Sequence, residues 1–305
     1  MNVIEWLLEG DESVSFLTKK HLLNGKPEQK NLGFIKRYLD EYDRDHHMFG
    51  SGVYGPKWIS THYTMLELKY MEISFDHPIY QDALKTLLEY EWHNNGMYRK
   101  NRHQDMCIVG MLLNISCYGQ TKDHKIYQMI DYILDHQFID GGWNCTWEFK
   151  HPKISSVHTT LSIIEGLHEY VINNYNYRVE EVKQKISDGI DCLLNRRIFL
   201  KKSLNEPIDK FMADVHYPPR WKYDVLKALE FFSNCNLPYD DRMKDAILHL
   251  KSLMIGPYLK KGIKIPGIIH FQLEDERFGR FNTLRALKVL KTYDKMTYET
   301  LINQS

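Results

Sequence analysis

The stretch HTTLSIIEGLHEY, residues 158–170, shows the pattern that decides the fold. Its apolar residues recur at three- and four-residue spacing, which predicts an α-helix. Apolar side chains occur on more than one face of this helix, so we expect protein to cover it on both sides. Two serines, Ser155 and Ser156, precede it, and small polar residues of this kind favour helix N-termini.

Segments of the same shape recur through the chain, and they alternate with more charged, amphipathic segments that tolerate water on one side. Such a repeated helix pair is typical of helical-repeat architectures. The predicted buried helices are Val14–Leu23, Thr61–Ile73, Cys107–Ser116, His158–Tyr170, Tyr223–Phe232 and Asn282–Leu290. The predicted amphipathic helices are roughly Lys30–Tyr42, Ile79–Trp92, Tyr127–His136, Val179–Asn195 and Asp241–Leu253.

The order of these helix pairs favours a closed ring over an open stack. An open stack of repeats needs polar capping repeats at both ends, and the sequence shows no such asymmetry. No linker or low-complexity tract divides the chain. We therefore predict an all-α protein, one domain over residues 1–305, whose six helical hairpins close into a ring, an (α/α)6 toroid, around a central cavity.

Composition and charge exclude several classes of protein. Forty basic and forty acidic residues cancel, and without a basic stripe this argues against a general nucleic-acid binder. No apolar run approaches the roughly 18 residues that a membrane-spanning helix needs. The N-terminus has acids where a signal peptide would be apolar, and five irregularly spaced cysteines do not resemble a disulfide framework. We expect a cytoplasmic protein, and the composition leaves its oligomeric state open.

Long loops rich in glycine, tryptophan and histidine lead into the predicted buried helices. In a ring of hairpins these helix N-termini converge at one mouth of the cavity, where unpaired N–H groups and positive dipole ends favour anions or polarised ligands. Aromatic side chains there could line a pocket for a small hydrophobic or cationic ligand, or could pack between helices. The candidate lining residues are Trp58, Trp143, Trp147, Tyr217 and Trp221.

Three further polar residues near these helix starts are candidates for the site. His216 and Asp224 flank Trp221 and could form an acid–base pair. Arg280 could bind an anionic head group or form an ion pair within the protein. Titratable residues at helix starts are often structural, so both interpretations stay open for each of the three.

Several motifs resemble those of terpenoid cyclases and protein prenyltransferases. Residues 137–143, QFIDGGW, fit the Gln-x(2–5)-Gly-x-Trp repeat of squalene–hopene and oxidosqualene cyclases. Nearly the whole chain resembles short bacterial squalene-cyclase-like proteins whose activity is unassigned. The resemblance implies the toroid fold of this superfamily and does not imply its activity. The segments concerned are WISTHYTMLEL (58–68), DGGWNC (140–145), SSVHTTLSIIEGL (155–167), PRWKYDVLKAL (219–229) and RFNTLRALKVL (280–290).

The chain departs from the cyclases at their acid motif. Class II cyclases protonate their substrate with Asp-x-Asp-Asp, and this motif does not occur in the sequence. The aspartates Asp240, Asp241 and Asp245 resemble the metal-binding aspartates of class I terpene synthases at the wrong spacing. They follow Pro238 and are better interpreted as a helix N-cap. Cyclisation started by proton transfer therefore loses its main support.

The resemblance to protein prenyltransferases implies a zinc site. Those enzymes hold zinc with Asp-x-Cys at one inner helix start and a His opening a later inner helix, which corresponds here to Asp105, Cys107 and His158. Three such ligands leave a fourth position open. Cys145 could close the site, or Cys107, Cys145 and His158 could form the Cys-Cys-His set of lanthionine cyclases, which share the toroid. Alternatively, Cys107 is a buried core residue, Asp105 an N-cap and His158 a hydrogen-bonded helix-start residue.

Three functional hypotheses follow. In the first, the protein is an enzyme, terpenoid cyclase- or prenyltransferase-like, that acts on a small isoprenoid-type substrate with zinc as a candidate cofactor. In the second, the same cavity binds a lipid or terpenoid without catalysis. In the third, the protein is a carbohydrate-active (α/α)6 enzyme, which needs two carboxylates flanking a sugar. Asp105 and Asp224 are the candidates for that pair.

Overall fold

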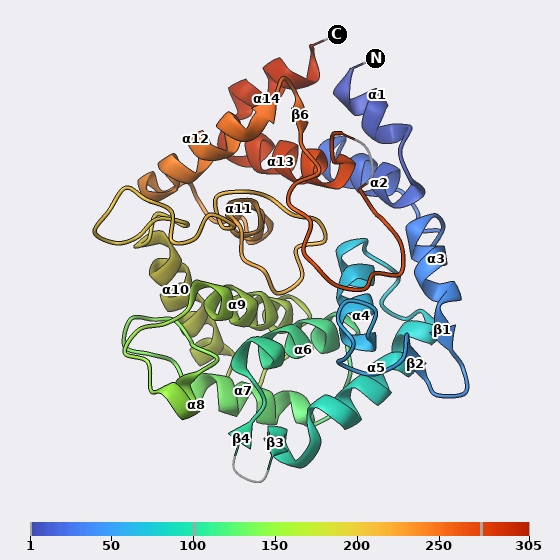
Figure 1. Cartoon of the computed structure of the whole chain (residues 1–305), viewed down its shortest axis with the longest axis vertical. Helices are drawn as coiled ribbons and strands as arrows, with labels where there is room; N and C mark the ends of the chain where they lie inside the picture. The colour runs from blue at the N-terminus through green and yellow to red at the C-terminus, as the bar shows by residue number, and fades with distance from the viewer. Residues whose placement is uncertain (1, 100–101, 275–276, 305) are drawn as a thin grey trace. The chain divides into compact units, whose positions relative to one another are not determined.

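The computed structural model describes residues 2–99, 102–274 and 277–304, and it is mostly helical (Figure 1). Helices account for 53% of the chain, and the strands form three short antiparallel ribbons of two strands each. The all-α prediction is thus confirmed. Within the described residues, no helix is long and apolar enough to cross a membrane.

The described chain divides into two compact units, each made of segments that are not contiguous in sequence. Unit 1 comprises Met1–Asp40, Met71–Ile73 and Leu194–Ser305, and unit 2 comprises Glu41–Tyr70 and Ser74–Leu193. Each unit is described by itself below. Closure of the helices into a ring, and a single domain over residues 1–305, remain predictions.

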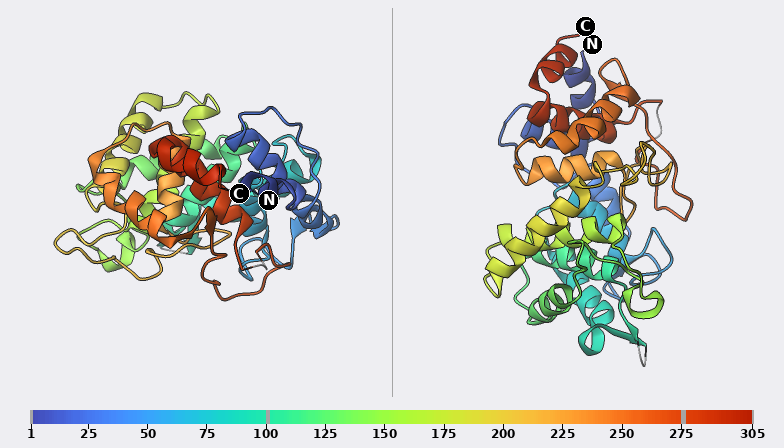
Figure 2. Two further views of the ribbon diagram at one scale, coloured as in Figure 1. Left: turned by 90° about the horizontal axis from the view of Figure 1, so that it is seen from above. Right: turned by 90° about the vertical axis from the view of Figure 1, so that its left-hand side faces the viewer.

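Unit 1 is built around the contact between α11 (Val225–Asn234) and α13 (Arg280–Tyr293). Its first and last helices, α1 (Val3–Leu8) and α14 (Lys295–Ile302), lie side by side (Figures 1 and 2). Asp240 accepts a hydrogen bond from the Arg242 backbone N–H at the start of a short helix, so its interpretation as an N-cap is confirmed. The helices are α1 (Val3–Leu8), α2 (Glu12–Leu17), η1 (Thr18–Leu22), α3 (Phe34–Asp40), α11 (Val225–Asn234), η3 (Asp241–Met243), α12 (Lys244–Leu253), α13 (Arg280–Tyr293) and α14 (Lys295–Ile302). The ribbon pairs β5 (Met254–Ile255) with β6 (Tyr258–Leu259).

Unit 2 contains three of the predicted buried helices, α4, α6 and α9, and in it α4 packs against α6 and α6 against α9. The helices are α4 (Thr61–Tyr70), α5 (Pro78–Glu91), η2 (His93–Gly96), α6 (Met106–Tyr118), α7 (Lys125–Asp135), α8 (Trp147–Lys150), α9 (Val157–Ile172) and α10 (Val179–Leu194). The ribbons pair β1 (Tyr42–Asp43) with β2 (Met48–Phe49), and β3 (Met97–Arg99) with β4 (Arg102–His103).

Each predicted buried segment contains a helix, and the differences at the ends have local causes. α4 ends at Tyr70 rather than Ile73, because the chain turns through a left-handed residue, Glu72, at φ 55°. α11 begins at Val225 rather than Tyr223, because Asp224 caps it: the Asp224 side chain accepts a hydrogen bond from the Lys227 N–H. The apolar periodicity of the sequence does not reveal where a helix is capped or where the chain turns.

Two glycines let α6 and α9 approach until their backbones touch. A Cβ atom on Gly166 would lie 2.4 Å from the Gly110 carbonyl oxygen, and one on Gly110 would lie 2.6 Å from the Ser162 carbonyl oxygen. Both distances are shorter than any side chain tolerates, so only glycine permits this approach. The glycines therefore hold α6 and α9 close together where Gly110 faces Ser162 and Gly166.

Candidate functional site

The three buried helices of unit 2 each place a candidate side chain at the second helical residue. These residues are His62 of α4, Cys107 of α6 and His158 of α9. Backbone N–H groups in the first turn of a helix have no partner within the helix, and the positive dipole end favours negative charge there. The helix starts of unit 2 thus combine polar side chains with an environment suited to anionic groups.

Cys107 and Cys145 lie together at the start of α6. The Cys107 backbone N–H donates to Cys145 Sγ at 3.0 Å, and the Thr159 hydroxyl donates to the same sulfur at 3.2 Å. The two thiols are also hydrogen-bonded to each other, and neither forms a disulfide. We name Cys107, Cys145 and Thr159 the thiol site.

The two sulfurs of the thiol site differ in acidity. The hydrogen bond from the Cys107 thiol lowers the pKa of Cys145, burial raises it, and the Thr159 hydroxyl and the Cys107 N–H lower it further, with a net decrease. The contact with Cys145, together with burial, raises the pKa of Cys107 well above its usual value. Cys145 is therefore the more acidic of the two thiols, and Cys107 is the one that donates to it.

The other two predicted zinc ligands have different surroundings. Asp105 lies at the N-cap of α6 without capping it, and its carboxylate accepts from Arg102 Nη2 at 2.8 Å. His158 is partly buried in the first turn of α9. Among the residues that the structure describes, no group of three or more His, Cys, Asp or Glu side chains is arranged to hold a metal ion. The structure thus brings Cys107 and Cys145 together without completing a set that fits zinc, and zinc remains a prediction.

A buried histidine–glutamate pair lies in the same unit, and the sequence analysis missed it. His62 Nδ1 is 2.9 Å and 2.8 Å from the two Glu91 carboxylate oxygens, and both side chains are 0% exposed. The rings of Tyr54 and Tyr63 contact the imidazole, with centroids 5.4 Å and 5.0 Å away. The two tyrosine hydroxyls are 3.2 Å apart. We name His62, Glu91, Tyr54 and Tyr63 the His62 cluster.

Electrostatics link the His62 cluster with the start of α6. Burial raises the pKa of Tyr54 and of Tyr63, and electrostatic interactions with Cys107 and Glu91 raise both further. The two hydroxyls therefore lie within electrostatic range of both side chains. One sequence signal could have found His62: HYT at 62–64 and HTT at 158–160 occupy equivalent places at the starts of buried helices.

The three predicted pocket tryptophans of unit 2 have different environments. Trp58 is 5% exposed and packs edge-on against Tyr63, with centroids 4.8 Å apart. Trp143 is fully buried and donates from Nε1 to the Ile133 carbonyl at 2.8 Å. Trp147 is partly exposed and lines a shallow surface depression of ≈ 350 Å³. Trp58 and Trp143 are packing residues here, whereas Trp147 is open to solvent. The depression is lined by His136, Gln137, Phe138, Trp147, His151 and Pro152.

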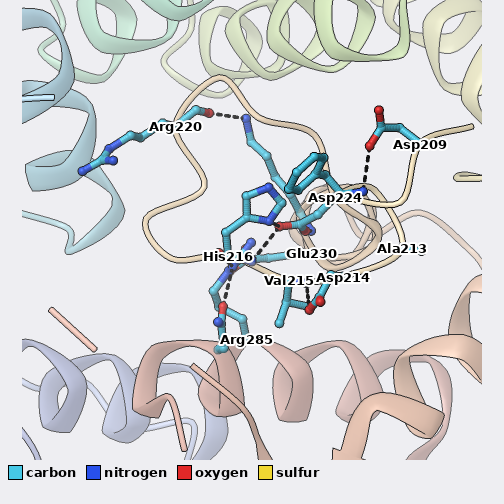
Figure 3. Close-up of polar contacts among 12 residues, drawn as sticks. Asp209, Ala213, Asp214, Val215, His216, Arg220, Asp224, Glu230 and Arg285 are labelled. Atoms are coloured by element: carbon cyan, nitrogen blue, oxygen red, sulfur yellow. Dashed lines mark hydrogen bonds and ion pairs between the residues drawn. The ribbon is translucent and has the colours of Figure 1, made fainter. Parts of the chain in front are cut away.

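Unit 1 holds the predicted His216–Asp224 pair at the start of α11 (Figure 3). His216 Nδ1 is 2.9 Å from Asp224 Oδ2, and the side chains are 1% and 0% exposed. The carboxylate also accepts from the backbone N–H groups of Lys227 at 2.6 Å and of His216 at 3.2 Å. Both carboxylate oxygens thus accept backbone hydrogen bonds that hold the loop before α11 onto that helix.

An arginine from α13 completes this group, and the sequence analysis missed it too. Arg285 donates from Nε to Glu230 at 2.6 Å and from Nη1 to the His216 carbonyl at 3.3 Å (Figure 3). Burial raises the pKa of Asp224, but His216, Arg285 and the Lys227 N–H lower it more, so the pKa lies below its usual value. Asp224 is therefore an ionised, fully buried helix cap.

The remaining predicted binding residues of unit 1 contact other parts of that unit. Tyr217 stacks on Phe281, with centroids 4.1 Å apart and planes 9° apart. Trp221 is partly buried beside the ammonium of its neighbour in sequence, 4.5 Å from the ring centroid. Arg280 lies 4.3 Å over the Trp6 ring and donates to the Trp6 carbonyl, so it joins α13 to α1.

Comparison with known proteins adds no family to these observations. No protein-family model matches the chain, and no curated protein matches it significantly. The resemblance to terpenoid cyclases and prenyltransferases therefore depends on the sequence motifs alone and remains a prediction.

Proposed function

We propose that this protein is an enzyme that acts on a small hydrophobic, isoprenoid-type substrate and that Cys145 is its nucleophile. The thiol site is the observation that carries the proposal. Cys145 Sγ accepts hydrogen bonds from the Cys107 N–H, the Cys107 thiol and the Thr159 hydroxyl. Three donors on one sulfur stabilise a thiolate, and the thiolate is the reactive form of cysteine.

The pair of thiols supports a displacement at carbon. The Cys145 thiolate attacks an electrophilic alkyl or allylic carbon of the substrate and forms a carbon–sulfur bond. The leaving group departs with the electron pair of the broken bond. The Cys107 thiol gives its proton to that leaving group and becomes the thiolate. A second nucleophile, an alcohol or water, then displaces Cys145 from the same carbon; Cys145 leaves as the thiolate, and the proton of the second nucleophile returns to Cys107. No step of this scheme uses a metal.

The surroundings of the thiol site favour an apolar substrate. α4 packs against α6, and its first turns carry the rings of Tyr63 and, through the preceding loop, Tyr54 and Trp58. Tyr54 and Trp58 each contact Tyr63, and the three rings are mostly buried. Aromatic surface of this kind binds hydrocarbon chains by the hydrophobic effect.

The proposal also includes the toroid fold that the sequence motifs imply. We infer that the helical hairpins close into an (α/α)6 toroid, with the starts of the buried helices at one mouth of its cavity. A cytoplasmic location fits a protein that keeps all five of its cysteines as thiols.

The two other hypotheses make different demands on the side chains. A glycosidase needs two carboxylates that reach the sugar, but Asp224 is fully buried as a helix cap and Asp105 is paired with Arg102. These contacts argue against a carbohydrate-active enzyme. A protein that binds a lipid without catalysis needs the apolar rings but does not need three hydrogen-bond donors to the Cys145 sulfur.

The test is the reactivity of Cys145 toward N-alkylmaleimides of increasing chain length, followed by mass spectrometry. We expect the rate for Cys145 to rise at least about tenfold from the ethyl to the octyl reagent, because burying two methylene groups already contributes about 1.6 kcal/mol. Cys235, partly buried in unit 1, is the matched control and should show no such rise.

Variants separate the contributions to this reactivity. Thr159→Val removes one donor to Cys145 and should slow the reaction at every chain length, whereas Cys235→Ser should leave the Cys145 rates unchanged. Equal rates for Cys145 and Cys235 would show that Cys145 is not an activated nucleophile. Labelling rates of Cys145 that do not depend on the chain length of the reagent would contradict the proposal that the substrate is hydrophobic.

A further inference from the structure

His62 is a buried histidine whose second ring nitrogen lacks a partner. Nδ1 is held by Glu91, while Nε2 is buried and has no hydrogen-bond partner among the residues that the structure describes. Since Nδ1 faces a carboxylate, it carries the ring proton, and Nε2 is then an acceptor with an unused lone pair.

This unpaired nitrogen calls for an explanation. Buried polar groups in folded proteins are nearly always hydrogen-bonded, because a buried acceptor without a donor destabilises the fold. A purely structural link between α4 and α5 needs only the contact between Nδ1 and Glu91. Nε2 can therefore accept a hydrogen bond from a donor outside the described residues.

The neighbours of His62 define what kind of donor fits. The rings of Tyr54 and Tyr63 pack against the imidazole, and Trp58 packs against Tyr63. The Tyr54 and Tyr63 hydroxyls share one hydrogen bond, which leaves the proton of the second hydroxyl available to another acceptor. An acceptor nitrogen and a donor hydroxyl inside an aromatic shell match an alcohol group, which both donates and accepts.

We propose that His62 Nε2 accepts a hydrogen bond from a hydroxyl group of the substrate, so that the substrate is a hydrophobic alcohol. Glu91 is the positioning residue that keeps the lone pair on Nε2, and the tyrosine pair donates to the alcohol oxygen. This inference rests on the proposed function, from which it takes the hydrophobic, isoprenoid-type ligand.

The test compares two probes that differ only in the donor. Geraniol carries a hydroxyl, and geranyl methyl ether has the same hydrocarbon chain without an O–H. Calorimetric titration of the full-length protein should show geraniol binding about threefold to tenfold more tightly than the ether, as expected for one additional neutral hydrogen bond. His62→Phe should abolish this preference. His168→Gln, a substitution near the other end of α9 in the same unit, should leave it unchanged.

Each outcome bears on one of the two proposals. Equal binding of alcohol and ether, as expected if a water molecule already satisfies Nε2, overturns this inference and leaves the proposed function intact. Failure of both probes to bind overturns the hydrophobic substrate as well. A preference that survives in His62→Phe assigns the alcohol to another group and overturns the role of His62.

A spectroscopic measurement covers the case in which His62→Phe does not fold. In the wild-type protein labelled with ¹⁵N-histidine, the Nε2 resonance of His62 should move upfield when geraniol is added, because the lone pair then accepts a hydrogen bond. Geranyl methyl ether should leave it in place. An Nε2 resonance that ignores both probes, although geraniol binds, contradicts the contact.

Discussion

In the part of the chain that the structure describes, both units contain a buried histidine paired with a carboxylate, and the two pairs are built in different ways. In unit 1, His216 and Asp224 are eight residues apart and meet where a loop enters α11. In unit 2, His62 and Glu91 are 29 residues apart and come from two different helices, α4 and α5. In both, Nδ1 lies within 2.9 Å of a carboxylate oxygen.

This difference is the reason why we interpret the pair in unit 1 as structural and propose that the pair in unit 2 faces a ligand. Both oxygens of Asp224 accept backbone N–H groups, so that carboxylate is already used in holding the chain. Glu91 turns both oxygens toward a single imidazole, whose other nitrogen is left without a partner among the described residues. A carboxylate that caps a helix stabilises the fold, whereas one that only orients a histidine prepares that histidine for another contact.

The largest effect should follow from removing the structural carboxylate. Asp224→Ala leaves two buried backbone N–H groups without their acceptor and His216 without its ion-pair partner, so we expect a loss of about 4 kcal/mol in the free energy of unfolding. Urea unfolding measures it. Asp224→Asn keeps an acceptor for the cap and should lose clearly less. A loss below about 1 kcal/mol for Asp224→Ala would contradict the structural role.

The next effect concerns the helix contact beside the thiol site. Gly166→Ala places a Cβ atom 2.4 Å from the Gly110 carbonyl, which forces α6 and α9 apart. We expect a destabilisation of about 3 kcal/mol and slower maleimide labelling of Cys145. Gly55→Ala is the control, because no atom lies within 4 Å of its added Cβ. If Gly166→Ala and Gly55→Ala have the same free energy of unfolding, the close approach of α6 and α9 does not contribute to stability.

Another histidine–carboxylate contact, closer to the surface of unit 1, should have an intermediate effect. Burial raises the pKa of Glu72, but hydrogen bonds from His21 and Lys20 lower it more, to about 2 in the folded state. Because this pKa lies below the usual 4.5, Glu72 stabilises the fold fully above about pH 4.5 and loses that contribution as the pH falls toward 2.

We expect this contribution to be about 2 kcal/mol, after a reduction for the partial exposure of the pair. Urea unfolding between pH 7 and pH 2.5 measures it as the difference between the wild type and Glu72→Gln. That difference should shrink with acid. A constant difference across this range would mean that Glu72 does not ionise in the way its contacts indicate.

The smallest effect on stability should come from the ligand-facing pair. Glu91→Gln keeps the size of the side chain and one acceptor for Nδ1, so we expect a loss of only about 1 kcal/mol in the free energy of unfolding. Its effect on binding should be the larger one, because the lone pair is no longer confined to Nε2 and the preference for geraniol over its ether should fall. A large loss of stability with an unchanged preference would make this pair structural, like that of unit 1.

Much of this organisation could be predicted from apolar periodicity. The segments around α6 and α9 are apolar on most faces, and both are buried helices in the structure. The cap at Asp240 followed from local sequence, since a capping residue and the N–H it accepts are neighbours in the chain. The sequence predicted the proximity of Cys107 and Cys145 only as one of several alternatives, because Cys145 lies in a long loop whose path the sequence does not reveal.

The sequence by itself determined the helices and the polar residues that open them, because both depend on contacts between residues a few positions apart. Only the tertiary structure decided the partners of those residues. Glu91 reaches His62 because α5 packs against α4, and Arg285 reaches the His216 carbonyl because α13 packs against α11. Side chains that meet across two helices are brought together by packing, and their separation along the chain leaves no local pattern from which to predict them.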